Sequence, residues 1–228
     1  MLRKHPEIMA QNPLRLLKRG FATYTDDDNR FVLGAGMKAK ADIERDRRLD
    51  VDEEQRILSG LDAHPDQKAL FILAFETEMR MRECYTLDIS QINLPKKTIS
   101  LDRTKNGDSR QVPLSSTAIA LLRDFMESQS AAIKECGGRL FPFWSGDVRV
   151  TALDSATSEL SRVFRVVFLN AKVKDFHFHD LRHEATCRLY EKTTLSDVLI
   201  AKITGHRSLR MLQRYASLRG SDLAPHLW

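Results

Sequence analysis

The sequence has few cysteines and no long apolar run. Its three cysteines, Cys84, Cys136 and Cys187, are widely spaced and form no Cys-x-x-Cys pair. That spacing argues against a disulfide framework and against a cysteine-rich zinc site. No apolar stretch approaches the roughly 20 residues that a membrane-spanning helix needs, and the N-terminus shows no signal-peptide core. We therefore expect a protein of the reducing cytoplasm that makes no contact with a membrane.

The length and charge of the chain fit a globular protein with an anionic partner. Its 228 residues, 42% of them hydrophobic, suit one large domain or one domain with an appendage. The net charge of +5 is a mild indication of nucleic-acid binding. Residues 149–228 carry 13 basic and 8 acidic side chains, whereas residues 51–148 carry 12 and 15. Both a phosphate-binding face and an ordinary solvated surface would show this distribution.

Hydrophobic periodicity predicts a mainly helical domain with a small three-stranded antiparallel sheet, an α+β fold. The strands are expected at Ile89–Ile92, Thr98–Leu101 and Arg110–Leu114, and the Asn-Gly pair before the third is a strong hairpin signal. Lys105 would then lie at or beside a turn tip. Helices are expected from Asp52 to Leu61, from Leu70 to Met79 with Arg80 near the end, from Ser115 to Met126, from Leu160 to Phe168, from Asp180 to Leu189, from Ser196 to Ile203 and from Leu209 to Tyr215.

Residues 1–48 suggest a short helical piece around Asn12–Leu14 and then lose any periodicity, and we interpret them as an N-terminal appendage or linker. The periodic part, residues 49–228, would form the main domain. Gly205 is expected to end the helix before it, which places His206 at a helix boundary. Tyr215 then lies either in the core or at the edge of a cleft next to His206, and taken alone it is best explained as a half-buried aromatic side chain.

Four segments together resemble the tyrosine recombinase (phage integrase) family. Two are C-terminal: the His-x-x-Arg of residues 179–182, and Thr-Gly-His at 204–206 with a tyrosine nine residues after the histidine. Residues 77–83 resemble the family's first arginine motif, and residues 104–114 resemble its lysine-bearing hairpin. The four occur in the family's order, and the resemblance covers Leu49 to Ala216. Residues 1–48 would be a remnant of the separate DNA-clamping, or core-binding, domain of that family.

The resemblance implies phosphodiester exchange without metal, nucleotide or other cofactor. Tyr215 would attack phosphorus and form a 3′-phosphotyrosyl link, which conserves the bond energy for rejoining. A phenol has a pKa near 10, so it needs a proton acceptor, and His179 would be this base or its proxy. Lys105 would give a proton to the leaving 5′-oxygen. Arg80, Arg182 and His206 would stabilise the charge on the non-bridging oxygens.

The neighbours of these residues have expected roles as well. Glu83 would brace Arg80 or a nearby backbone amide, and Arg82 would lie on the surface. His177 and His183 are expected to face away from the cleft. The family's usual glycine two residues before the first arginine is Glu78 here, which places a carboxyl group close to a phosphate-binding group.

The function that the resemblance implies is site-specific DNA recombination, integrase-like. The implied partner is double-stranded DNA, bound by a homotetramer on two synapsed duplexes. Free of DNA, the candidate state of the protein is a monomer, and accessory DNA-bending proteins are candidate partners. The expected location is the cytoplasm, at the nucleoid of a bacterial or phage host cell. Two alternatives stay open: a DNA-binding regulator or remnant that does not cleave, and a DNA-relaxing enzyme similar to type IB topoisomerases.

Overall fold

The structure is a computed structural model that describes residues 47–101, 109–206, 208–212 and 215. All of these belong to one unit that spans residues 46–228. Nearly all of the predicted appendage lies outside the described residues, so its boundary with the main domain stays a prediction. Within the described ranges, no helix has the length and apolarity that a membrane crossing requires.

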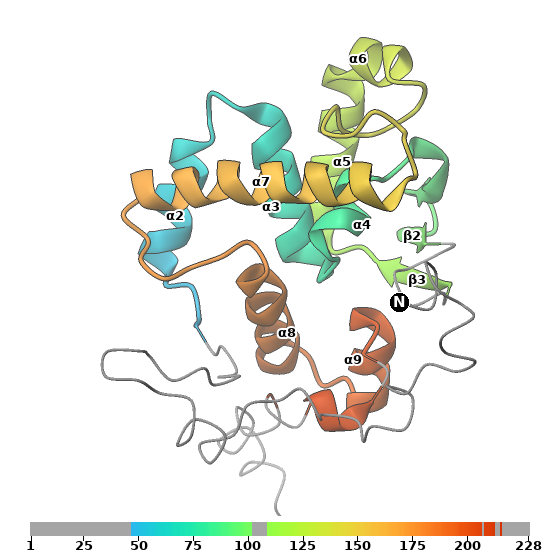
Figure 1. The fold of residues 1–228 in the computed structure, drawn as a ribbon. Helices are drawn as coiled ribbons and strands as arrows, with labels where there is room; N and C mark the ends of the chain where they lie inside the picture. Colours follow the sequence, from blue (N-terminus) through green and yellow to red (C-terminus); the bar gives the residue numbers. More distant parts are fainter. Residues whose placement is uncertain (1–46, 102–108, 207, 213–214, 216–228) are drawn as a thin grey trace, which may run out of the picture. The chain divides into compact units, whose positions relative to one another are not determined.

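The described elements confirm the predicted fold class, a mainly helical α+β domain with a three-stranded antiparallel sheet (Figure 1). The sheet order is β1-β2-β3, and in its register Ile99 faces Val112, both fully buried. The elements are α2 (Val51–Gly60), α3 (Pro65–Thr77), α4 (Met81–Tyr85), the 3-10 turn η2 (Ile89–Gln91), β1 (Ile92–Asn93), β2 (Thr98–Leu101), β3 (Arg110–Pro113), α5 (Ser116–Ser128), α6 (Ser130–Glu135), α7 (Val150–Asn170), α8 (Asp180–Lys192), α9 (Asp197–Thr204) and the 3-10 turn η3 (Leu209–Leu212).

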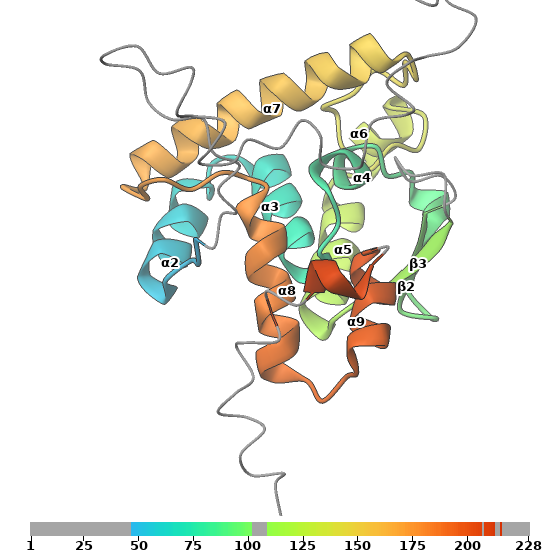
Figure 2. The same ribbon diagram turned by 60° about the horizontal axis from the view of Figure 1, so that its bottom comes forward.

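Helix α3 lies at the centre of the core. It packs against α4, α5 and α8, and its apolar side chains are almost all buried. Helix α7 covers α2 and α4 with the predicted stripe of Leu160, Phe164 and Phe168, each at most 3% exposed (Figures 1 and 2). Helix α9 packs against β3 and α8, which brings the C-terminal motifs next to the sheet (Figure 2).

Two predicted boundaries are wrong, each because of a local backbone feature. Residues 89–91 form a turn and not a strand, since the Asp88 carboxylate accepts a hydrogen bond from the Ser90 amide. Helix α3 ends at Thr77 because Glu78 adopts a left-handed conformation with φ +51°, so the first arginine lies beyond it. The expected helix from Leu209 to Tyr215 starts as the 3-10 turn η3, and residue 215 is helical. Residues 213 and 214 lie outside the described residues, so the rest of that helix stays a prediction.

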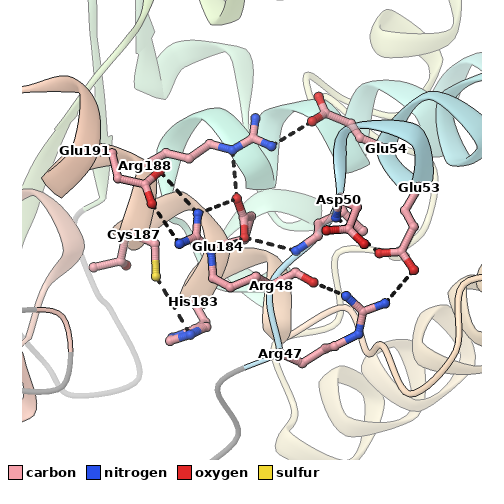
Figure 3. A network of polar contacts seen from close by, with 12 residues as sticks. Arg47, Arg48, Asp50, Glu53, Glu54, His183, Glu184, Cys187, Arg188 and Glu191 are labelled. Atoms are coloured by element: carbon pink, nitrogen blue, oxygen red, sulfur yellow. Dashed lines mark hydrogen bonds and ion pairs between the residues drawn. The ribbon is translucent and has the colours of Figure 1, made fainter. Parts of the chain in front are cut away.

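A polar network fastens the first described residues to α8 (Figure 3). The carboxylate of Glu184 is buried and accepts hydrogen bonds from Arg48, from the Leu49 amide and from Arg188. Arg188 also pairs with Glu54 of α2 at 2.7 Å. The helix that carries the His-x-x-Arg motif is therefore held at its centre by charged groups from two other segments.

Candidate functional site

Arg80 is positioned by the turn between α3 and α4. The left-handed Glu78 breaks α3, and Arg80 then occupies the N-cap position of α4 with extended backbone angles. Its amide donates to Glu83 Oε2 at 2.8 Å and its Nη1 donates to Glu83 Oε1 at 3.1 Å. The prediction that Glu83 braces Arg80 is thus confirmed for both the side chain and the backbone. Arg82 is paired with Asp154 at 2.6 Å, as expected of a surface arginine.

Glu83 has a second arginine partner that the sequence analysis missed. Arg110 Nη1 and Nη2 donate to the two carboxylate oxygens of Glu83 at 3.2 and 2.9 Å. The Arg110 side chain is 9% exposed and that of Glu83 is 8% exposed. Alternation along β3 is the signal that identifies Arg110, because residues 110 and 112 share one face of a strand and Val112 is fully buried.

Arg182 projects from α8 into the same cluster and is buried. Its guanidinium donates to the backbone carbonyls of Glu78 and Thr204, which close α3 and α9. Burial, together with the nearby charges of Arg80 and Arg110, lowers the pKa of Arg182 to about 10. Glu83 and Tyr215 act in the opposite direction. Arg182 stays charged at neutral pH and belongs to a cluster of three arginines.

Glu78 adds a buried carboxyl group to this cluster. Its residue is 4% exposed, and burial raises its pKa to about 8, an effect that the charge of Arg182 partly offsets. Within the described residues no hydrogen bond or ion pair to its carboxyl group is seen. The side chain is therefore neutral at pH 7, so it does not cancel the charge of the neighbouring guanidinium.

His179 occupies the N-cap position of α8 next to the two predicted arginines. Part of the residue stays exposed to solvent, yet the surrounding protein and the charge of Arg182 lower the pKa of its imidazole. The ring is consequently neutral at pH 7 and can accept a proton. His177 is exposed, with its Nδ1 3.5 Å from Asp180 Oδ2, although it also borders a cavity.

Two cavities meet at Arg80 and His179. One, of about 450 Å³, also includes Arg182 and two exposed arginines of α7, Arg162 and Arg165. The other, of about 720 Å³, lies on the side of the apolar Trp144 and Leu153. Arg80 and His179 thus lie between a lining that adds three arginines and a lining that adds Trp144 and Leu153.

Tyr215 lies against a stripe of side chains on α8. It is 5% exposed, and the ring centroids of His183, Tyr190 and His206 lie 5.1, 6.0 and 6.2 Å from its own. His183 borders neither of the two cavities, as expected, but it faces Tyr215. Residues 183, 187 and 190 follow each other at helical spacing on one face of α8, and Tyr215 packs on that face. His183 also contacts Cys187, with Nε2 3.8 Å from Sγ.

The proton position on His206 follows from its contact with Thr204. His206 Nδ1 lies 2.6 Å from Thr204 Oγ1, and Thr204 Oγ1 donates to Ile200 O at 2.8 Å. A hydroxyl carries one proton, so we assign the donor in the histidine contact to Nδ1. A neutral His206 then has its lone pair on Nε2, and His206 can donate through Nε2 only when both nitrogens are protonated.

The structure therefore brings together three predicted site residues, Arg80, His179 and Arg182, and separately places His206 beside Tyr215. The charge of Tyr215 acts on Arg182, which links the two groups. The remaining predicted residue, Lys105, falls in 102–108 and lies outside the described residues. No group of three or more potential metal-ligating side chains is found among the residues that the structure describes.

Comparison with known proteins gives consistent matches. The profile described as "Phage integrase family" matches residues 47–221. The chain is 36% identical over 191 residues to the shufflon-specific DNA recombinase of Escherichia coli, a match that covers 83% of this chain and 45% of that protein. It thus spans about half the length of that relative.

Solved structures share the fold at lower identity. The catalytic domain of bacteriophage HP1 integrase matches with a TM-score of 0.55 and 22% identity, over 79% of this chain and 94% of that one. The XerH site-specific recombinase bound to palindromic difH substrate matches with a TM-score of 0.59 and 20% identity, over 81% of this chain and 54% of that one.

Proposed function

The chain belongs to the phage integrase family, and on that premise we propose that it carries the catalytic domain of a site-specific tyrosine recombinase. The observation that supports this most is the convergence of Arg80, from the turn before α4, with His179 and Arg182, from the start of α8, where two cavities meet. A buried tyrosine and a histidine lie together on the neighbouring face of α8. A domain that needed only a core would not gather uncancelled positive charge in this way.

In the proposed reaction, Tyr215 Oη forms a bond to phosphorus while the bond to the 5′-oxygen breaks. The phenol proton passes to a neutral imidazole, and the family resemblance assigns this role to His179. His183 is a second candidate for the base, because its ring contacts the ring of Tyr215. Lys105 supplies the proton for the 5′-oxygen. Protonation at both ring nitrogens of His206 gives a donor for a non-bridging oxygen.

The arginines supply the electrostatic part of the proposal. Negative charge grows on the phosphoryl oxygens in the transition state, and fixed guanidiniums stabilise it without reorganisation. Arg80 and Arg182 are already held by carboxylate and carbonyl groups before any DNA binds. Such a site needs neither a metal ion nor a nucleotide, and the exchange conserves the energy of the phosphodiester bond.

The partners follow from this chemistry. We propose double-stranded DNA as the substrate and a tetramer on two synapsed duplexes as the active assembly, because exchange between two duplexes requires four cleavages. Accessory DNA-bending proteins and a location at the nucleoid of the cytoplasm follow from the same substrate. The XerH structure with difH DNA is one family example of a DNA-bound recombinase.

Covalent capture tests the proposal. The full chain is incubated with a library of nicked duplexes that have a randomised central segment, and DNA that stays bound in detergent is sequenced. We expect wild-type protein to form such an adduct and Tyr215→Phe to form none, with both binding DNA equally. An adduct that persists in Tyr215→Phe would refute the nucleophile. DNA binding with no adduct or nicking would favour a non-cleaving regulator, and relaxation of supercoiled DNA without recombinants would favour a topoisomerase-like enzyme.

A further inference from the structure

Arg110 connects three segments of the candidate site. It is the first residue of β3 and pairs with Glu83 of α4 through both terminal nitrogens of its guanidinium. The same guanidinium lies against Gly205, where an added Cβ would come within 2.5 Å of Nη1 and 3.0 Å of Cζ. Along the sequence, Arg110 follows Lys105 by five residues.

The first consequence concerns the charge on Arg80. Glu83 is 8% exposed in its side chain and accepts from both Arg80 and Arg110. With Arg80 as its only partner, the buried carboxylate would form a neutral pair with the group that must hold the phosphate. Sharing the carboxylate between two arginines leaves one positive charge over, and Arg182 adds another.

The second consequence concerns the Thr-Gly-His turn. Gly205 has φ +72° and ends α9, so His206 follows directly from a left-handed residue. The planar guanidinium of Arg110 lies against that glycine. A side chain that is held by two hydrogen bonds to Glu83 therefore sets the distance between α4 and the turn that carries His206.

We propose that Arg110 is a positioning residue for DNA cleavage: it keeps Arg80 available to the phosphate by sharing Glu83, and it fixes the Thr-Gly-His turn through its contact with Gly205. This inference rests on the proposed recombinase function. It predicts that Arg110 acts through Glu83, so its importance should depend on whether residue 83 carries a charge.

The test compares four variants of the full chain with wild-type protein: Arg110→Gln, Arg110→Lys, Glu83→Gln and the double variant Glu83→Gln/Arg110→Gln. The matched control is Arg188→Gln, because Arg188 also pairs with two carboxylates, Glu54 and Glu184, but lies outside the site. The rate of adduct formation is measured in single turnover at saturating protein on duplexes recovered by the covalent capture. Affinity is measured separately by fluorescence anisotropy on the same duplexes without the nick.

We expect Arg110→Gln to slow adduct formation by about 10²-fold, the scale of a small displacement of a catalytic group, while the affinity for DNA changes little. Arg110→Lys keeps the charge and should recover part of the rate. In the Glu83→Gln background, Arg110→Gln should slow adduct formation by less than about tenfold, because no carboxylate remains to be shared. The control variant Arg188→Gln should be less stable than wild-type protein but should form the adduct at the wild-type rate.

Three outcomes would overturn the inference. One is a wild-type rate in Arg110→Gln, another is an equal loss of rate in both backgrounds, and the third is a loss confined to DNA affinity. Unfolding by urea provides a readout that needs no DNA, since Glu83 and Arg110 should show coupled effects on stability. If wild-type protein forms no adduct while this coupling is present, the proposed function fails and the pairing of the two side chains stands.

Discussion

Glu78 gives the most direct test of the electrostatics of this cluster, because its carboxyl group should make folding depend on pH. Burial raises its pKa from 4.5 to about 8 in the folded protein. Below pH 4.5 the carboxyl group is protonated in both the folded and the unfolded protein, so its ionisation does not affect stability. Between pH 4.5 and about 8 the unfolded chain has released the proton and the folded protein still holds it, so stability falls as pH rises.

The magnitude follows from the width of that window. Each pKa unit corresponds to about 1.4 kcal/mol, so the loss of stability builds up to on the order of 5 kcal/mol by pH 8. Above pH 8 both states are ionised and the loss stops growing. Total stabilities of domains are about 5–15 kcal/mol, so the effect is large enough to measure by urea unfolding between pH 5 and pH 9.

Two substitutions separate charge from backbone strain. Glu78→Gln removes the ionisation and keeps the left-handed strain of φ +51°, so its advantage over wild type should be small at pH 5 and largest near pH 8. Glu78→Gly also relieves the strain and should add about 1–2 kcal/mol at every pH. Glu159→Gln, on an exposed position of α7, controls for the loss of one negative charge. Parallel stability curves for wild type and Glu78→Gln would refute the assignment of a buried neutral carboxyl group.

Three further substitutions probe the contacts around the site. Gly205→Ala puts a side chain on a left-handed residue and into the guanidinium of Arg110, so we expect a loss of about 1–2 kcal/mol in urea unfolding together with slower adduct formation. Thr204→Val removes the partner of His206 Nδ1 and should slow adduct formation by up to about 10²-fold, the lower range for a general acid; an unchanged rate would contradict the assigned role. Arg48→Gln should lower the free energy of unfolding by less than the loss of about 3–5 kcal/mol that is typical of a broken buried ion pair, because Arg188 still binds the carboxylate of Glu184 (Figure 3).

The sequence predicts the fold well where packing follows local periodicity. The stripe of Leu160, Phe164 and Phe168 on α7 repeats at helical spacing and is buried as expected. Gly205 ends α9 in the left-handed conformation that a C-terminal glycine favours. The motif residues Arg80 and Arg182 also meet as the resemblance implies, because the order of the motifs reflects a shared fold.

What the sequence leaves open depends on contacts between segments that are distant along the chain. Arg110 faces inward by strand alternation, but its partner at residue 83 is set by the packing of the sheet against α4. His183 faces Tyr215 because the ring of Tyr215 packs against one side of α8, and no local pattern specifies that side. Glu78 gives no helix-stop signal of the kind that glycine gives, so the helix that the sequence predicts extends past the end of α3 at Thr77.

The backbone at residue 78 explains how a glutamate can stand where the family usually has glycine. Arg182 donates to the carbonyls of Glu78 and Thr204, at the C-terminal ends of α3 and α9, where helix dipoles favour a cation. The left-handed turn is what directs the first of these carbonyls to the guanidinium, and the side chain at that position takes no part in either bond. The site therefore requires the conformation of residue 78 and not its carboxyl group, which burial keeps neutral at pH 7. A glycine would adopt the same conformation at lower cost, so Glu78→Gly should keep both hydrogen bonds of Arg182 while it raises stability.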